Sequence, residues 1–287
     1  MIRHGLRGFL LILAVAGAWS GAGAQTLNFG AGESDQPIEI FADDGIEWQQ
    51  ENLLFLARGN ARAVRGEVTV HGDELRAYYR EKPDGGSEIF RLDAIGNVRI
   101  VSPTQEGTAA QAVYDVDGAV LVLTGSTPRF RSGDDIVVAE RQIEYWEQKQ
   151  MAVARGNATA TREDRTLRAE TLAAYFRKDE AGKNSVFRVD AFDRVVIRTA
   201  TETANGDRGV YNVESGIATL TGSVKVERDN NVLTGCRTEV NLKTNISKMF
   251  ACPTDRVRGV LTPTKGPKSQ SAPATGKGAT APKSTKP

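Results

Sequence analysis

The sequence Ala-Arg-Gly-Asn-Ala occupies residues 57–61 and returns unchanged at residues 154–158, which is 97 positions later. The same offset aligns residues 90–94 with 187–191 and residues 123–126 with 220–223. An ungapped alignment that starts at Ile46 has roughly 30 identical pairs among 97, well above chance. A period of 97 is too long for one coil of a solenoid. We therefore expect two copies of a multi-stranded block, residues 46–142 and 143–239.

Hydrophobic residues alternate with polar ones inside each block, as in residues 67–71, 97–101 and 223–227. A period of two is typical of β-strands with one buried face. Turn-forming residues recur about every 8 to 12 positions, and Arg58-Gly59-Asn60 and Asn205-Gly206 are two of these groups. The pattern predicts an all-β protein of many antiparallel strands. We expect Gly59 and Gly156 to serve turns, because glycine tolerates a positive φ.

The composition favours a binding or structural role over catalysis. Lys plus Arg is 37 and Asp plus Glu is 36, so bulk positive charge cannot drive binding to nucleic acid. Two histidines, His4 and His71, cannot build a multi-histidine zinc site, and two cysteines cannot build a four-cysteine site. We expect no metal, no cofactor and no catalytic residues. A carboxylate pair formed by Asp73 and Glu170, which share one repeat position, is the remaining catalytic alternative.

Both termini differ in composition from the repeated region. Residues 1–24 have the basic, apolar and Ala-X-Ala segments of a cleaved secretory signal peptide, the alternative being an uncleaved anchor. Residues 25–35 form an expected flexible mature N-terminus. Residues 262–287 contain Pro, Gly, Ser, Thr and five lysines but no acid or aromatic residue, which predicts a disordered tail. Its lysines could contact anionic headgroups or simply be solvated.

Export would place Cys236 and Cys252 in an oxidising compartment. The alternating segments on either side of Lys243-Thr244-Asn245 predict a hairpin. A hairpin symmetric about Thr244 puts the two cysteines opposite each other, within bridging distance. We expect a structural disulfide. Two buried free thiols remain the alternative, and the absence of a Cys-X-X-Cys motif disfavours a redox pair.

A series of short motifs then resembles a known family. In chain order they are Gln36-Pro-Ile-Glu-Ile40, Ala42-Asp43, Gly59-Asn60, Gly72-Asp73, Tyr114, Val120–Gly125 and Arg256–Pro263. Their order and spacing over about residues 36–264 are similar to the OstA-like family, which includes the lipopolysaccharide-transport protein LptA of Gram-negative bacteria. The internal duplication and the two cysteines depart from that pattern.

The resemblance implies an elongated open β-jellyroll, or β-taco, of two facing antiparallel sheets over residues 36–261. It implies a periplasmic protein that shields the acyl chains of lipopolysaccharide in an apolar slot. Inner-membrane-anchored and outer-membrane translocon components, and further copies joined head to tail, would pair with its strand edges. Two blocks of about eight strands in two sheets would give roughly eight rungs, or on the order of 40 Å of slot.

Two other functions stay open at this point. A structural β-sandwich or solenoid assembly protein would have a filled interior and carry no lipid. A carbohydrate-active enzyme would need clustered carboxylates and aromatic platforms. The resemblance and the alternation together select the inward residues that would line a lipid slot. They are Ile38, Ile40, Val68, Val70, Leu75, Val98, Ile100, Tyr114 and Val116 in the first block and Val195, Ile197, Tyr211 and Val213 in the second.

Overall fold

The computed structural model describes residues 37–83, 85–178, 184–241, 243–244 and 246–262. Every regular element in this described part is a β-strand. It contains no helix that is long and apolar enough to cross a membrane. The expected signal peptide 1–24, the linker 25–35 and the tail beyond Thr262 lie outside the described residues.

All strand pairings are antiparallel, and together they join the strands into one continuous array. The strands are β1 (Glu39–Phe41), β2 (Gly45–Gln49), β3 (Leu54–Arg65), β4 (Val68–Glu81), β5 (Ser87–Val101), β6 (Gln105–Asp115), β7 (Val120–Thr124), β8 (Arg129–Ser132), β9 (Asp135–Val138), β10 (Gln142–Trp146), β11 (Met151–Arg162), β12 (Arg165–Lys178), β13 (Asn184–Arg198), β14 (Glu202–Asn212), β15 (Ile217–Arg228), β16 (Asn231–Asn241), β17 (Ile246–Phe250) and β18 (Arg258–Val260).

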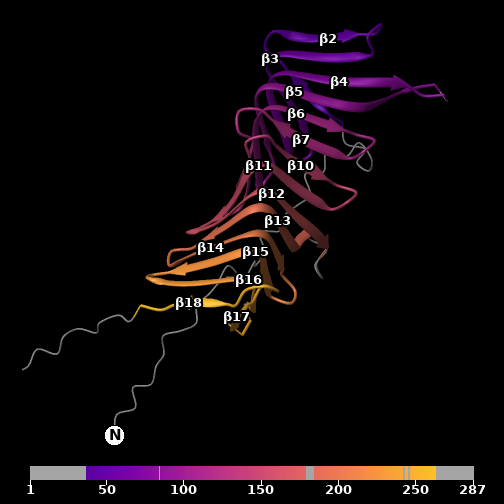
Figure 1. Ribbon diagram of the computed structural model, residues 1–287. Coiled ribbons are helices and arrows are strands. Elements are labelled where there is room, and N and C mark those ends of the chain that lie inside the picture. The colour runs from indigo at the N-terminus through magenta and orange to yellow at the C-terminus, as the bar shows by residue number, and fades with distance from the viewer. Residues whose placement is uncertain (1–36, 84, 179–183, 242, 245, 263–287) are drawn as a thin grey trace, which may run out of the picture.

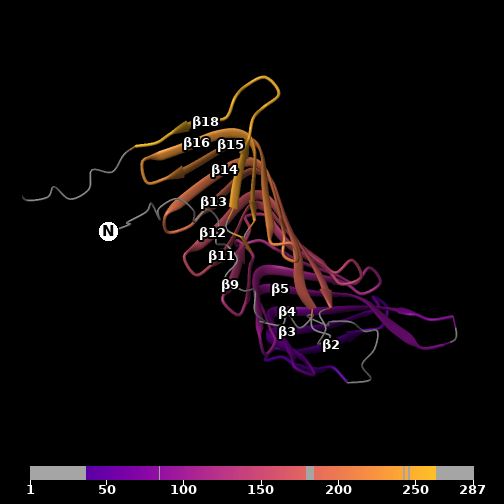
Figure 2. The same cartoon turned by 90° about the horizontal axis from the view of Figure 1, so that it is seen from below.

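The long strands bend, so that the array folds into two facing layers along an elongated stack (Figures 1 and 2). We call the layer that contains β2, β7, β10 and β17 arm one, and the layer that contains β1, β8, β9 and β18 arm two. The long strands, such as β3 and β16, run through both arms. The prediction of an elongated, all-antiparallel β-jellyroll is confirmed.

Each bend coincides with a β-bulge. The pairing of β3 with β4 shifts between Arg58 and Ala61, and that of β11 with β12 shifts between Arg155 and Ala158. The bulged strands take positive φ at these places, 78° at Gly59 and 85° at Gly156. A bulge adds an unpaired residue and increases the local twist, which turns the strand without ending it. The corner between the arms is therefore a column of bulges.

The expectation that Gly59 and Gly156 serve turns between strands is wrong, because both lie inside continuous strands. The need for glycine is nevertheless clear at both positions. A Cβ at Gly59 would lie 2.5 Å from the Asp44 carboxyl group, and one at Gly156 would lie 2.7 Å from the Arg141 side chain. Each glycine allows both the positive φ and the close approach of the neighbouring segment.

The two blocks have the same strand pairings, since β2 to β6 correspond to β10 to β14 at the offset of 97 residues. The ungapped alignment is wrong beyond Gly125. Thr108 pairs with Arg129, and its equivalent Asn205 pairs with Lys225. Arg129 therefore corresponds to Lys225, at an offset of 96 residues instead of 97. The extra residue lies in the first block, where the segment around the buried Pro128 separates β7 from β8; the second block has the single strand β15.

The hydrophobic core lies between the arms. Residues on alternate positions of both arms form one cluster, and many are alanine, such as Ala61, Ala94, Ala158 and Ala191. Ala61 and Ala158, beside the two bulges, are 0% exposed. Small side chains along the corner let the two layers approach there.

Candidate functional site

The space between the arms holds an apolar cavity of about 280 Å³ in the first block. We call the whole inter-arm space the slot. Among the cavity-lining residues, Leu75, Ala77, Ala94, Ala112 and Leu121 come from arm one. Ile40, Ala63, Val70 and Ile100 come from arm two. Both walls are apolar, so the cavity suits hydrocarbon chains rather than polar solutes.

The predicted lining residues divide into three groups. Those that line the cavity are Ile38, Ile40, Val70, Leu75, Ile100 and Tyr114. Val98 and Val195 lie in the buried core cluster, and Val68, Val116 and Ile197 pack against it. Tyr211 and Val213 are partly buried and lie outside that cluster.

Sequence reasoning missed several cavity residues, namely Ile46, Phe55, Leu56, Ala57, Ala63, Ala77, Ile89, Leu92, Ala94, Ala112 and Leu121. Two of them lie two positions from a predicted residue on the same strand, since Ala77 follows Leu75 and Ala112 precedes Tyr114. Extension of the period-two pattern along each strand would have found these two. Phe55 lies in a continuous apolar run, where alternation carries no information about the inward face.

Aromatic side chains stack at the N-terminal end of the stack. The rings of Trp48 and Phe55 are 5.2 Å apart, and those of Phe55 and Tyr79 are 5.3 Å apart. Trp48 Nε1 donates a hydrogen bond of 2.9 Å to the Tyr79 hydroxyl. Trp48 is nevertheless 59% exposed, and the neighbouring Ile46 is 52% exposed. The slot thus ends in a partly uncovered apolar surface on β2.

Tyr114 lies where the free ends of the two arms come near each other. Its hydroxyl donates a hydrogen bond of 3.2 Å to Glu147 Oε1, next to the end of β10 in arm one. Burial and the negative charge of Glu147 raise the pKa of Tyr114, whereas the positive charge of Arg65 opposes that rise. Arg65 ends the arm-two part of β3, so its charge acts on Tyr114 from the opposite arm. Polar groups therefore line the mouth of the slot, outside its apolar interior.

The outer face of arm one carries buried acids held by arginines. Arg91 donates hydrogen bonds of 2.7 and 3.0 Å to Asp93, and the equivalent Arg188 donates bonds of the same lengths to Asp190. Glu144 accepts bonds from Gln142, Trp146 and Arg155. These bonds from Gln142, Trp146 and Arg155 lower the pKa of Glu144 and outweigh its burial, which raises it. These carboxylates are satisfied structural groups.

The acids of the catalytic alternative also have structural partners. Asp73 accepts hydrogen bonds of 3.1 and 3.0 Å from the Asn97 side chain at the corner. Glu170 accepts a bond of 2.7 Å from Arg141 and pairs with Arg194. Neither acid is among the residues that line the cavity. His71 lies on β4 with its pKa lowered by burial and by Arg99 and Arg62.

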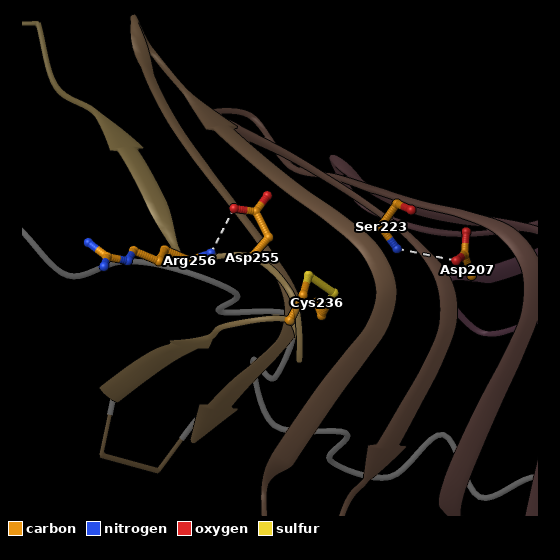
Figure 3. The surroundings of a disulfide bond; sticks show 6 residues. Asp207, Ser223, Cys236, Asp255 and Arg256 are labelled. Carbon is orange, nitrogen blue, oxygen red and sulfur yellow. Dashed lines mark hydrogen bonds between the residues drawn. A yellow bond between two sulfur atoms is a disulfide. The ribbon is translucent and has the colours of Figure 1, made fainter.

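Cys236 and Cys252 form a disulfide with their Cα atoms 4.9 Å apart. Figure 3 shows it beside the segment that contains Asp255 and Arg256. Arg237 pairs with Phe250 and Thr238 with Met249, so the register places Ala251 opposite Cys236. The expected symmetry about Thr244 is therefore wrong by one residue in register. The bridge reaches the next residue, where the chain leaves β17 in arm one for β18 in arm two.

Both ends of the stack present strand edges. Within the described residues, β1 and β2 pair only with β3, and β17 and β18 pair only with β16. Exposed apolar residues accompany each edge, Phe41, Ile46 and Trp48 at the first and Ile246, Val260 and Leu261 at the second. Strands with free backbone groups and apolar neighbours are suited to pairing with another chain.

Comparisons with known proteins identify a family that matches most of the chain. Residues 39–151 and 139–246 each match the family described as LptA/(LptD N-terminal domain) LPS transport protein. An uncharacterised protein of Rhizobium meliloti (strain 1021) is 23% identical over 109 residues, which is 37% of this chain and 58% of that protein. The chain thus spans less than two thirds of this relative's length.

One similar solved structure is that of LptH, described as the LptA homologous periplasmic component of the conserved lipopolysaccharide transport device from Pseudomonas aeruginosa. It is 12% identical to this chain and aligns over 79% of this chain and 96% of its own. The TM-score of the superposition is 0.20.

Proposed function

Since its two matched segments cover residues 39–246, the chain belongs to the LptA and LptD N-terminal domain family of LPS transport proteins, and from this premise we propose that it is a periplasmic carrier of lipopolysaccharide. The acyl chains would lie in the slot between the arms. The sugar headgroup would stay at the mouth, where the polar groups lie. The single observation that carries this proposal is the apolar cavity of about 280 Å³ between the two arms.

The length of the array supports a bridging role. Among the described residues, arm one contains fourteen strands in unbroken succession, β2 to β7 and then β10 to β17. At about 4.8 Å per strand this is on the order of 60 Å of slot. The expected length of about 40 Å assumed that each strand belongs to only one of the two sheets. It was too short because each long strand bends through both arms and therefore adds one rung to each arm. Fewer copies would then span a given distance.

The two edges supply the joining surfaces of this proposal. We expect the β1 and β2 edge of one copy to pair with the β17 and β18 edge of another. The same edges would join an inner-membrane-anchored partner and an outer-membrane translocon partner. Exposed Trp48 and Ile246 would be covered by such pairing.

The proposed lipid binding can be tested by filling the cavity with a larger side chain. Ala112 and Val113 are neighbours on β6, but Ala112 lies in the inter-arm core and lines the cavity, whereas alternation places Val113 on the outer face. We expect Ala112→Phe to abolish binding of lipopolysaccharide in a fluorescent fatty-acid displacement assay, while Val113→Phe binds as the wild type does. Circular dichroism checks that both variants are folded. A folded wild type that binds no lipid would refute the carrier and favour the structural assembly protein.

A further inference from the structure

At one repeat position on the inner face of arm two, each block has a buried side chain with unsatisfied acceptor oxygens. Gln105 and Glu202 occupy the same repeat position, and each is 6% exposed. Gln105 Oε1 and both carboxylate oxygens of Glu202 lack a hydrogen-bond partner among the described residues. Buried acceptors without a donor are rare in native proteins, because each costs its lost hydration.

Both side chains face the slot. On β6 the buried positions alternate as Gln105, Gly107 and Ala109, and Ala109 belongs to the core between the arms. On β14 the same alternation begins with Glu202 and continues to Ala204, which is also in that core. Since every second residue of a strand points to the same face, Gln105 and Glu202 point inward.

Their depth in the slot is also equivalent. Each is the first residue of its strand, immediately after a tight turn in which its carbonyl oxygen accepts a hydrogen bond from Ser102 N or Thr199 N. The acceptors therefore lie at the free end of arm two, at the mouth of the slot. Toward the corner the wall becomes apolar, with Ala204, Val224 and Val226 each at most 4% exposed.

The surroundings of Glu202 favour an uncharged or hydrogen-bonded carboxyl group. Burial raises its pKa to about 7, and the positive charge of Arg228, its neighbour on β15, opposes that rise. Arg228 does not hydrogen-bond to it. A donor that enters the mouth would satisfy the carboxyl group at no cost to the fold.

Taking the proposed lipid carrier as the premise, we propose that Gln105 and Glu202 are two equivalent headgroup sites, which accept hydrogen bonds from the sugar hydroxyl and amide groups of a bound glycolipid. The acyl chains of the same molecule would lie deeper, against the apolar wall. Six strand steps in arm two separate β6 from β14, or about 29 Å, so each site would hold its own headgroup.

The test compares two lipids on the full chain. Lipid A carries sugar hydroxyl and amide donors, whereas palmitate has an acyl chain and no sugar. We expect the double variant Gln105→Met and Glu202→Met to bind lipid A about tenfold more weakly and palmitate unchanged. The matched control Glu202→Gln keeps an acceptor oxygen and should bind lipid A as the wild type does.

Thermal unfolding without lipid supplies a second measurement. Removal of two unsatisfied acceptors should leave the melting temperature of the double variant equal or higher. A lower melting temperature would show that the acceptors are structural and would overturn the proposal. Unchanged lipid A affinity, or an equal loss for both lipids, would overturn it as well. A wild type that binds palmitate but not lipid A would refute the headgroup sites, whereas one that binds neither would refute the carrier itself.

Discussion

The first and second blocks are built from the same pairings but finish differently. In the first, β2 and β1 leave an edge with exposed Trp48 and Ile46 beside the cavity. In the second, the chain crosses the corner once more after β17 and is fixed there by the bridge between Cys236 and Cys252. Duplication therefore lengthened one slot and left its two ends free to differ.

The corner shows what the duplication kept. Gly59 and Gly156 take similar φ values at the same bulge, and Ala61 and Ala158 beside them are fully buried. The walls show what it changed. Phe55 corresponds to Ala152 and Gln105 to Glu202, so the second block has a smaller inner side chain at the first of these positions and an acidic one at the second. The bend is thus a shared requirement, and the lining is adjustable.

The largest effect should come from the matched isoleucines Ile100 and Ile197. Ile100 is 2% exposed, whereas Ile197 is only partly buried. We expect Ile100→Ala to lower the free energy of unfolding by about 3–4 kcal/mol and Ile197→Ala by about 1–2 kcal/mol, because less packing is lost at the second site. Urea denaturation measures both. Equal losses would show that the two walls are packed alike.

The disulfide should come next. It closes a loop of 16 residues at the end of the second block. Its replacement by two alanines at Cys236 and Cys252 should destabilise the protein by about 3 kcal/mol, since the unfolded chain gains freedom. Hydrogen exchange should locate the loosening in β16 to β18 and leave β3 to β6 protected. Faster hydrogen exchange across both blocks would mean that the disulfide does not stabilise the C-terminal end of the array independently of the rest.

The corner glycines should show equal effects. Gly59→Ala and Gly156→Ala each force a side chain into positive φ and against a neighbouring segment. A cost of about 2 kcal/mol is expected for each. Alanine at Gly85, which also has positive φ but open space around it, is the control and should cost less. A clear difference in destabilisation between Gly59→Ala and Gly156→Ala would contradict the conclusion that both blocks need the same bulge at the corner.

The smallest effect should be a pH dependence that Glu202 supplies and that its counterpart in the first block, Gln105, cannot supply, because an amide does not titrate. Because the folded-state pKa of Glu202 is raised from 4.5 to about 7, the folded protein holds this proton more tightly than the unfolded chain does. Stability is then greatest at low pH and falls by roughly 1 kcal/mol as the pH rises from about 4.5 to about 7. Glu202→Gln should remove this slope in a series of melts from pH 5 to 8. If the pH dependence of stability persists in Glu202→Gln, another titratable group causes it.

Much of the architecture could be predicted from the sequence, because period-two alternation and the repeat both survive as local patterns. The bulges could not. Gly59-Asn60 inside β3 has the composition of a hairpin turn, and only the pairing on both sides shows that the strand continues. The extra residue near Pro128 was hidden for a similar reason, since the local sequences on both sides still alternate.

The candidate site was predicted in part. Leu75 and Ile100 could be placed on the inner wall because their strands alternate cleanly. Phe55 could not, because its neighbours are also apolar. Gln105 and Glu202 were missed because a polar residue in an alternating strand is expected to face solvent, and only burial between the arms shows otherwise.

A photo-crosslinking amino acid placed at Ile100 or at Ile197 tests most directly whether one lipid slot runs through both blocks. Arg99 and Val196, the outward neighbours at equivalent positions, are the controls. After irradiation in cells that produce lipopolysaccharide, we predict lipopolysaccharide adducts at Ile100 and Ile197 and none at Arg99 or Val196. Adducts at neither inner site, or equally at the controls, in a folded and exported protein would contradict the account.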